Sequence, residues 1–286
     1  MGIFSFFKKK AKKNHIQNST RPKITLGCEK VDTRYCIIES TPLAENKIFG
    51  LTDKGMIRDN NEDFFVIAPT FGLYIVADGM GGHAAGEVAS KEVCKLILSY
   101  FMKKTTEIKF NKKNIKNMLY NVFQKAHNTI LSIANQDHQY EGMGTTLLVA
   151  LIHEDRLYIS HIGDVRAYLW NKDNLKQMTE DHSVVWQLIK TGTMTKEDAR
   201  HSNMKAMITQ AIGMNQPIVN SFVESNLIPG NKIILCSDGL WEMLSDNRIA
   251  EIVSSGRTAK EITENLVQEA NNAGGHDNIT IITYIH

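Results

Sequence analysis

The chain reads Thr145-Thr-Leu-Leu-Val-Ala-Leu-Ile152, then His153-Glu-Asp-Arg156, then Leu157-Tyr-Ile-Ser-His-Ile162, and after Gly163-Asp164 it continues as Val165-Arg-Ala-Tyr-Leu-Trp170. Short apolar runs rich in β-branched and aromatic residues, bounded by turn residues, are typical of buried strands. Tight turns between such runs are typical of hairpins. This stretch therefore predicts three antiparallel strands.

Other strands are predicted on the same pattern. Phe71-Gly-Leu-Tyr-Ile-Val-Ala77 ends in Asp78-Gly79, and Lys232-Ile-Ile-Leu-Cys236 ends, one Ser later, in Asp238-Gly239. Both runs therefore present an Asp at the C-terminal end of a predicted strand, and a further strand is expected over 278–285.

Apolar residues recur at helical spacing in several segments. They predict two long helices and four shorter ones, over 86–104, 112–136, 183–191, 206–212, 245–254 and 258–272. Grouped helices together with adjacent antiparallel strands indicate an α+β class. We expect two stacked antiparallel β-sheets flanked by helices, an αββα sandwich, because this arrangement buries the apolar stripes of both long helices.

The composition of the 286-residue chain is ordinary for a globular protein, with 42% apolar and 22% charged residues. Its net charge of +2 depends on five lysines between positions 8 and 13, without which 28 basic residues face 31 acidic ones. A nucleic-acid-binding body would carry its excess charge on a folded face, so no nucleic-acid partner is expected. The four cysteines form no CxxC pair, which fits a cytoplasmic, reducing location.

The N-terminus combines Met1-Gly-Ile-Phe-Ser-Phe-Phe7 with the run of lysines. Its apolar part is too short for a secretory signal, and no run of ~18 apolar residues predicts a transmembrane helix. Residues 1–13 are a candidate for peripheral contact with an anionic membrane surface, where each Lys contributes about 1 kcal/mol. A solvated tail is the alternative. Residues 23–48 contain short β-prone pieces such as Tyr35-Cys-Ile-Ile38.

Six acidic residues occupy turn-like positions or predicted strand ends: Glu62, Asp63, Asp78, Asp164, Asp238 and Asp277. Any one of them is more often a turn residue than a ligand. If the fold gathers them, each pair 4 Å apart repels by ~1 kcal/mol in water and ~4 kcal/mol at an effective dielectric of 20, so protonation or cations are required. An all-oxygen set favours hard ions such as Mg²⁺, Mn²⁺ or Ca²⁺ over Zn²⁺.

Nucleotide binding is the weaker alternative. Gly79-Met-Gly-Gly-His-Ala84 fits G-x-G-x-x-A, the glycine pattern of a dinucleotide-binding fold. That fold places an acidic residue about 20 positions further on, at the end of a second strand. Here Ser99-Tyr-Phe-Met-Lys-Lys104 ends a predicted helix, and the predicted hairpins are antiparallel.

Seven short motifs, each weak alone, occur in one order across residues 48–286. They are Leu51-Thr-Asp-Lys-Gly-Met-Ile-Arg58-Asp-Asn-Asn-Glu62-Asp63, Ile75-Val-Ala-Asp78-Gly-Met-Gly-Gly-His83, Gly142-Met-Gly-Thr-Thr146, Ile162-Gly-Asp164-Val-Arg166, Met178-Thr-Glu-Asp181-His-Ser183, Ser237-Asp238-Gly-Leu-Trp241 and Asp277-Asn278. In this order they resemble the type 2C metal-dependent Ser/Thr protein phosphatases, in their bacterial form.

The resemblance implies a role for each acidic residue. Asp78 would bridge two metal ions, with the Gly79 carbonyl on one of them, and Asp238 and Asp277 would complete the first ion's ligands. Glu62 would hold the second ion, partly through water, and Asp63 would support that site. Asp164 and Asp238 would hold a third ion. Arg58 would grip the substrate phosphate with its planar donor fork.

The chain departs from the family pattern at two places. Eukaryotic members carry a His, proposed as the general acid, where this chain has Met80, so His83 is a candidate acid, although a helix N-terminal residue is an equal interpretation. Residues 183–205 correspond to the mobile flap beside the site, and the segment from His201 to Gly213 is less basic than in many bacterial members. Residues 1–47 are expected to be an N-terminal extension, with a basic and disordered start, to a catalytic domain over 48–286.

The resemblance implies hydrolysis of phosphoserine and phosphothreonine in proteins by a metal-activated water, with two core Mn²⁺ or Mg²⁺ ions and a third. It also implies a Ser/Thr kinase as the opposing enzyme, and we expect a monomer. A pseudophosphatase that binds phosphoproteins without catalysis is the alternative. Loss of Asp78, Asp238 or Asp277 would favour that alternative, and all three are present.

Overall fold

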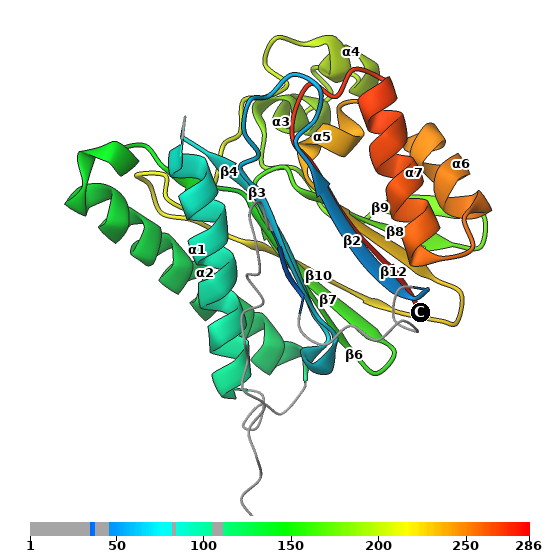
Figure 1. Cartoon of the computed structure of the whole chain (residues 1–286), viewed down its shortest axis with the longest axis horizontal. Coiled ribbons are helices and arrows are strands. Elements are labelled where there is room, and N and C mark those ends of the chain that lie inside the picture. Colours follow the sequence, from blue (N-terminus) through cyan, green and yellow to red (C-terminus); the bar gives the residue numbers. More distant parts are fainter. Residues whose placement is uncertain (1–34, 38–45, 82–83, 105–110) are drawn as a thin grey trace, which may run out of the picture.

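Two β-sheets lie face to face with helices on both outer sides in the computed structural model, which describes residues 35–37, 46–81, 84–104 and 111–286 (Figure 1). The predicted αββα sandwich is confirmed. Residues 1–13 and His83 lie outside the described residues, and so the predictions about them stay predictions. No helix among the described residues is long and apolar enough to cross a membrane.

The first sheet has the strand order β1-β3-β4-β6-β7-β10, with β5 beside β4. Its strands are β1 (Tyr35–Ile37), β3 (Asp63–Ala68), β4 (Leu73–Met80), β5 (Gly144–Thr145), β6 (Leu147–His153), β7 (Arg156–Ile162) and β10 (Ser221–Asn226). The pairs from β3 to β10 are antiparallel, whereas β1 runs parallel to β3. Residues 35–37 of the β-prone piece thus add one parallel edge strand to an otherwise antiparallel sheet.

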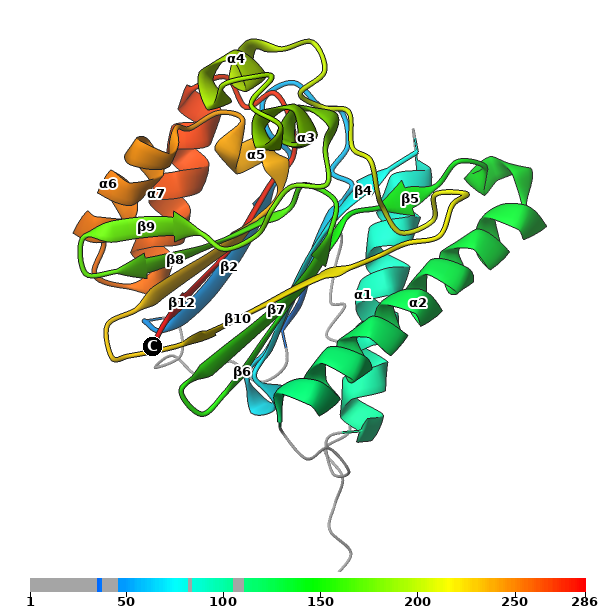
Figure 2. The ribbon, with the colours of Figure 1, turned by 180° about the vertical axis from the view of Figure 1, so that it is seen from behind.

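The second sheet is antiparallel, with the order β2-β12-β11-β8-β9. Its strands are β2 (Ile48–Asp53), β12 (Ile279–Ile285), β11 (Lys232–Cys236), β8 (Arg166–Asn171) and β9 (Asn174–Gln177). Figure 2 shows from behind that α1 (Ala84–Lys104) and α2 (Lys112–Gln136) cover the first sheet, while α6 (Asp246–Ser255) and α7 (Ala259–Asn272) cover the second. The shorter helices are α3 (Val184–Lys190), α4 (Lys196–His201) and α5 (Asp238–Trp241), and the 3-10 turns are Pro69–Phe71 and His138–Tyr140.

Strand alternation explains the three apolar layers of the core. On β7, Tyr158 packs in the layer beneath α1 and α2, whereas Leu157 and Ile159 pack between the two sheets. On β8, Leu169 also faces the space between the sheets, while Tyr168 packs toward α6. Both faces of each sheet are therefore buried, which is why these strands read as continuous apolar runs.

The prediction of three consecutive hairpin strands is wrong for its third strand. β6 and β7 pair antiparallel, but β8 pairs with β11 and β9 in the other sheet. Gly163, with φ of +94°, lies at this crossing, and a Cβ there would approach Thr146 Cβ to 2.6 Å. The apolar content of all three runs correctly predicts buried strands. It does not show whether two successive strands form a hairpin in one sheet or lie in different sheets.

The helix predicted over 206–212 is also wrong. This segment is extended and forms isolated bridges between Ile208 and Ser183 and between Ile212 and Thr145. Its amides are satisfied by neighbouring chain instead of by a helix, for example Thr209 N by the His182 carbonyl at 2.7 Å. The other five predicted helices are present as α1, α2, α3, α6 and α7.

Candidate metal centre

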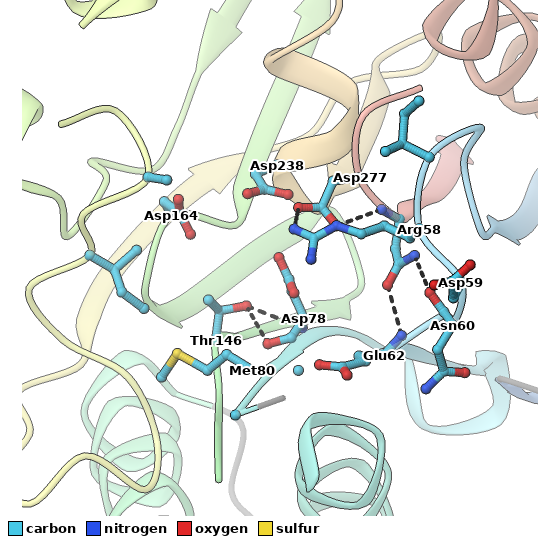
Figure 3. Close-up of a pocket in the computed structure, with 16 residues that line it drawn as sticks. Arg58, Asp59, Asn60, Glu62, Asp78, Met80, Thr146, Asp164, Asp238 and Asp277 are labelled. Atoms are coloured by element: carbon cyan, nitrogen blue, oxygen red, sulfur yellow. Dashed lines mark hydrogen bonds and ion pairs between the residues drawn. The ribbon is translucent and has the colours of Figure 1, made fainter. Parts of the chain in front are cut away.

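A pocket of about 680 Å³ opens at one end of the sandwich, where both sheets end (Figure 3). It collects seven of the residues predicted from the sequence. They are Arg58, Glu62, Asp78, Gly79, Asp164, Asp238 and Asp277. These residues span 220 positions of sequence, so only the fold brings them together.

Asp78 is fixed from both sides at the end of β4. Asp63 lies opposite it on β3, and the two residues are paired in the strand register. On the other side, Asp78 N donates to Thr146 Oγ1 at 3.1 Å, and Thr145 Oγ1 and Thr146 N both donate to the Asp78 carbonyl at 2.8 Å. The two threonines of the Gly-x-Gly-Thr-Thr motif therefore hold the backbone of Asp78 in place.

Asp238 opens the short helix α5 directly after β11. A Cβ on the next residue, Gly239, would lie 2.2 Å from the Asn278 carbonyl oxygen, so only glycine allows α5 to pack this closely on the segment that carries Asp277. The glycine of this Asp-Gly pair therefore serves close packing and does not form a turn, since its φ is not positive.

The backbone of Glu62 is held by hydrogen bonds to α1, to β4 and to Asn278. Its carbonyl accepts from Ser90 Oγ at 2.6 Å and from Gly79 N at 3.2 Å, and its own amide donates to Asn278 Oδ1 at 2.8 Å. A Cβ on Gly86 would lie 2.2 Å from Glu62 Oε2. Close packing of α1 on β3 thus directs the Glu62 side chain into the pocket, as Figure 3 shows.

Asp164 reaches the pocket from the crossing between the sheets. Its carbonyl accepts from Trp241 Nε1 at 3.1 Å, which ties the crossing to α5. The Asp164 side chain is buried, and burial, followed by the charge of Asp181, raises its pKa to about 7.

Burial and mutual repulsion disfavour ionisation of these carboxyl groups. Burial comes first for Asp78 and raises its pKa well above the usual range, and the charges of Asp63 and Asp238 act in the same direction. The pKa of Asp238 is raised in the same way, by burial and then by Asp164 and Asp277. Burial also raises the pKa of Asp63 to about 7, although Ser237 Oγ donates to Asp63 Oδ2 at 2.8 Å.

Among the described residues that line the pocket, Arg58 is the one cation. Arg58 Nη2 donates to Asp277 Oδ2 at 2.5 Å, and the Arg58 side chain is 56% exposed at the pocket mouth (Figure 3). A single guanidinium leaves the charges of Asp78, Asp164 and Asp238 uncompensated. Asp238 Oδ1 in particular is buried and has no hydrogen-bond partner within the described part of the chain.

This donor set fits divalent ions that keep part of their water. Carboxylate and carbonyl oxygens suit Mg²⁺ and Mn²⁺, and Asp238 Oδ1 offers a buried acceptor without a donor. Among the described residues, no three Asp, Glu, His or Cys side chains converge on one point as in a closed protein cage. Mg²⁺ is usually bound by one or two carboxylates plus water and substrate phosphate, so an open set of this kind suits it.

The comparisons with known proteins decide the family. A family model described as protein phosphatase 2C matches residues 58–275, more than half of the chain. The chain belongs to the protein phosphatase 2C family. The "Serine/threonine phosphatase stp" of Listeria innocua is 38% identical over 238 residues, which cover 81% of this chain and 92% of the relative.

Solved structures of the phosphatase 2C family agree with this assignment. The Ser/Thr phosphatase Stp1 from Staphylococcus aureus superposes with a TM-score of 0.77 at 30% identity, covering 90% of this chain and 99% of that one. The catalytic domain of the phosphatase PstP, solved in complex with two manganese ions, has a TM-score of 0.72 at 30% identity and covers 84% and 97%. A phosphatase 2C member with bound divalent metal is thus among the structural neighbours.

Two predicted site residues are placed differently from the rest. Asp63 lies behind Asp78 and does not line the pocket, and His83 lies outside the described residues. Thr146 and Asn278 belong to motifs of the family resemblance, but no role was predicted for either residue from the sequence. Asn278 Nδ2 donates to the carbonyls of Lys54 and Asn60 at 2.9 Å, and so it braces the loop that carries Arg58. Their positions inside motifs that occur in the family's order were the sequence feature that pointed to both residues.

The nucleotide-binding alternative does not fit this structure. β4 precedes the glycine-rich segment, but its neighbours β3 and β6 both run antiparallel to it. A dinucleotide-binding fold needs parallel strands at this place.

Proposed function

We propose that this chain hydrolyses phosphoserine and phosphothreonine in proteins with the help of divalent metal ions. The carboxyl groups of Asp78, Asp164 and Asp238 around one pocket carry this proposal. Asp164 is buried and the other two are half-buried, and cations are what would make such a cluster stable in its ionised form. Membership in the protein phosphatase 2C family supports it.

Asp78 would be shared by the two core ions, and the Gly79 carbonyl would bind one of them. Asp238 and Asp277 would complete the ligands of the first ion, and Glu62 would hold the second. Bound divalent ions neutralise a phosphate dianion and lower the pKa of water, which supplies a nucleophile at neutral pH. A third ion is held by Asp164 together with Asp238. The proximity of these two carboxyl groups supports this third site, because the charge of Asp164 helps to raise the pKa of Asp238.

Arg58 binds the substrate phosphate. Its guanidinium lies at the pocket mouth and is more than half exposed, so its remaining donors are accessible to a phosphate oxygen. A planar donor fork matches two phosphate oxygens at once. Asp63 does not touch the substrate and instead positions Asp78 from the neighbouring strand.

The leaving alkoxide needs a proton. Met80 lines the pocket and cannot donate one, so His83 remains the candidate general acid in this proposal. His83→Ala would lower turnover of phosphoserine peptides more than that of p-nitrophenyl phosphate, whose leaving group needs less protonation. Equal losses on both substrates would argue against His83.

Release of phosphate from a phosphothreonine peptide tests the proposed function. We expect release with Mn²⁺ or Mg²⁺ and none with EDTA. A folded protein that binds the peptide without hydrolysing it under either condition would favour the pseudophosphatase alternative.

The cellular context follows from the same proposal. Residues 48–286 form the catalytic domain with a flap over 183–205, residues 1–47 extend it, and the protein acts as a cytoplasmic monomer that opposes a Ser/Thr kinase. Residues 1–13 give it a peripheral membrane contact through their lysines. Co-sedimentation with vesicles of anionic lipid, compared with a chain lacking residues 1–13, tests that contact.

A further inference from the structure

Exposed apolar side chains lie on, or next in sequence to, two separate segments that line the pocket. Within the described part of the chain, six large apolar side chains are strongly exposed, and three of them are Met56 at 67%, Ile57 at 66% and Met207 at 53%. Single exposed apolar residues are ordinary, but a group at one place marks a contact surface.

This apolar surface is continuous with the pocket itself. Ile57 lines the pocket from the loop that carries Arg58, and Ala206 and Ile208 line it from the segment that follows the flap. Figure 3 shows Asp59 on one side of the pocket and Asp164 on the other, beside the yellow-green chain of that segment. We call Met56, Ile57, Met207 and Ile208 the apolar rim.

Backbone hydrogen bonds hold both halves of the rim. Met56 N donates to the Gly275 carbonyl at 2.8 Å, and the preceding Gly55 packs so closely on the Asp277 carbonyl that a Cβ would lie 2.2 Å from it. On the other side, Val184 N donates to the Met207 carbonyl at 2.9 Å, which ties this half to the start of the flap. The apolar side chains are therefore presented to solvent by fixed backbone.

Charges of both signs lie near the rim. Asp59 is exposed and lines the pocket mouth, and Lys205, next to the rim, is paired with Glu242 at 2.9 Å. Lys54 and Arg58 are both exposed on the loop that carries Met56, and an acidic side chain beside the phosphorylated residue could contact them. Preference for acidic peptides is therefore the competing outcome of the test.

We propose that the apolar rim binds apolar side chains on either side of the phosphorylated residue, so that the enzyme prefers phosphoserine and phosphothreonine flanked by Leu-like or Met-like residues over those flanked by acidic ones. This inference rests on the proposed function. A substrate whose phosphate reaches the Asp78 cluster has the rim beside it, because Ile57 and Ile208 line the same pocket and Met56 and Met207 precede them in the chain.

The test compares phosphothreonine peptides that are identical except for Leu, Glu or Lys on both sides of the phosphothreonine. Burying two methylene groups on binding corresponds to about tenfold in kcat/KM, so we expect about tenfold preference for the Leu peptide over the Glu peptide. In the double variant Met56→Gln/Met207→Gln, that preference should fall to about threefold or less. Ile228→Gln is the matched control, since Ile228 is 45% exposed but lies beyond the far end of β11 from Asp238.

Equal or better turnover of the Glu or Lys peptide, or a preference that the double variant leaves unchanged, would overturn the apolar rim. Hydrolysis of p-nitrophenyl phosphate, which has no flanking residues, separates this failure from failure of the proposed function. Hydrolysis of that compound without a preference among the peptides would contradict the apolar-rim proposal alone. No hydrolysis by folded protein in Mn²⁺ would contradict both the rim proposal and the proposed function.

Discussion

Asp63 and Asp78 face each other across two neighbouring strands, and the carboxyl group of Asp63 is buried whereas that of Asp78 is half-buried at the pocket. At the scale of the single residue, such burial has a cost that depends on pH. The pKa of Asp63 is raised to about 7, whereas the same group in an unfolded chain has a pKa of about 4. Between these values the folded protein binds more protons than the unfolded chain, so its stability falls as pH rises.

We therefore expect the metal-free protein, in EDTA, to unfold at a lower temperature at pH 7.5 than at pH 5.5. Asp164, with its pKa also raised to about 7, contributes in the same direction. Thermal unfolding at the two pH values, on wild type and Asp63→Asn, measures this. The neutral amide should reduce the pH difference, and an unchanged difference in the variant would show that Asp63 is not its source.

Arg58→Lys tests the planar donor fork. Lys keeps the charge but loses the paired donors, and a charge-assisted hydrogen bond contributes about 1.5–3 kcal/mol. We expect kcat/KM for a phosphothreonine peptide to fall by roughly 10- to 100-fold. Steady-state kinetics would show it, and a variant with wild-type kcat/KM would remove Arg58 from phosphate binding.

At the scale of the element, a buried cluster around Arg166 joins the start of the flap to the pocket. Arg166 Nε and Nη2 donate to the Asp181 carboxylate at 2.6–3.1 Å, and its guanidinium lies 3.7 Å from the ring centroid of Trp241. Trp241 in turn donates to the Asp164 carbonyl. Strand β8, the flap start and helix α5 are thus connected through one side chain.

Arg166→Met should destabilise the protein by about 3–5 kcal/mol, because it leaves the buried carboxylate of Asp181 without a cation, although Gln177 Nε2 still donates to it at 3.0 Å. Removing both charges in Arg166→Met/Asp181→Asn should restore part of that loss. Denaturant unfolding of the two single variants and the double variant gives the coupling energy. Additive losses would mean that the pair does not act as a unit.

Some helices and strands could be predicted from the sequence, and others could not. Long amphipathic helices such as 112–136 and apolar strands were predictable, because their periodicity follows from the layers that they pack against. The crossing at Gly163 and the extended segment over 206–212 were not predictable, because both depend on partners far away in the sequence, such as Thr146 for Gly163 and Thr145 for Ile212. Motif order located the pocket-lining residues, whereas the contacts of Asn278 needed the fold.

At the scale of the whole molecule, the two sheets share the pocket. Glu62 and Asp78 come from the first sheet and its edges, Asp238 and Asp277 come from the ends of β11 and β12 in the second, and Asp164 lies at the crossing. Ions held between them would link the two halves of the sandwich. Binding to the folded state alone stabilises it by mass action.

Saturating Mn²⁺ should therefore raise the melting temperature. At a concentration 100 times the dissociation constant the gain is about 2.7 kcal/mol, which corresponds to roughly 4–5 °C for a chain of this size. Differential scanning fluorimetry with Mn²⁺ and with EDTA measures the shift at pH 7.5. A shift that survives in Asp78→Asn would place the stabilising ion elsewhere.

The most direct test of the account is hydrolysis of p-nitrophenyl phosphate with Mn²⁺ and with EDTA, for wild type, Asp238→Asn and Asp173→Asn. Asp173 lies exposed in the turn between β8 and β9, so its variant controls for the loss of one acidic charge. We predict turnover that requires Mn²⁺ in wild type and in Asp173→Asn, and a loss of at least about 100-fold in Asp238→Asn. Turnover in EDTA, or an Asp238→Asn protein as active as wild type, would contradict metal-dependent catalysis at this pocket.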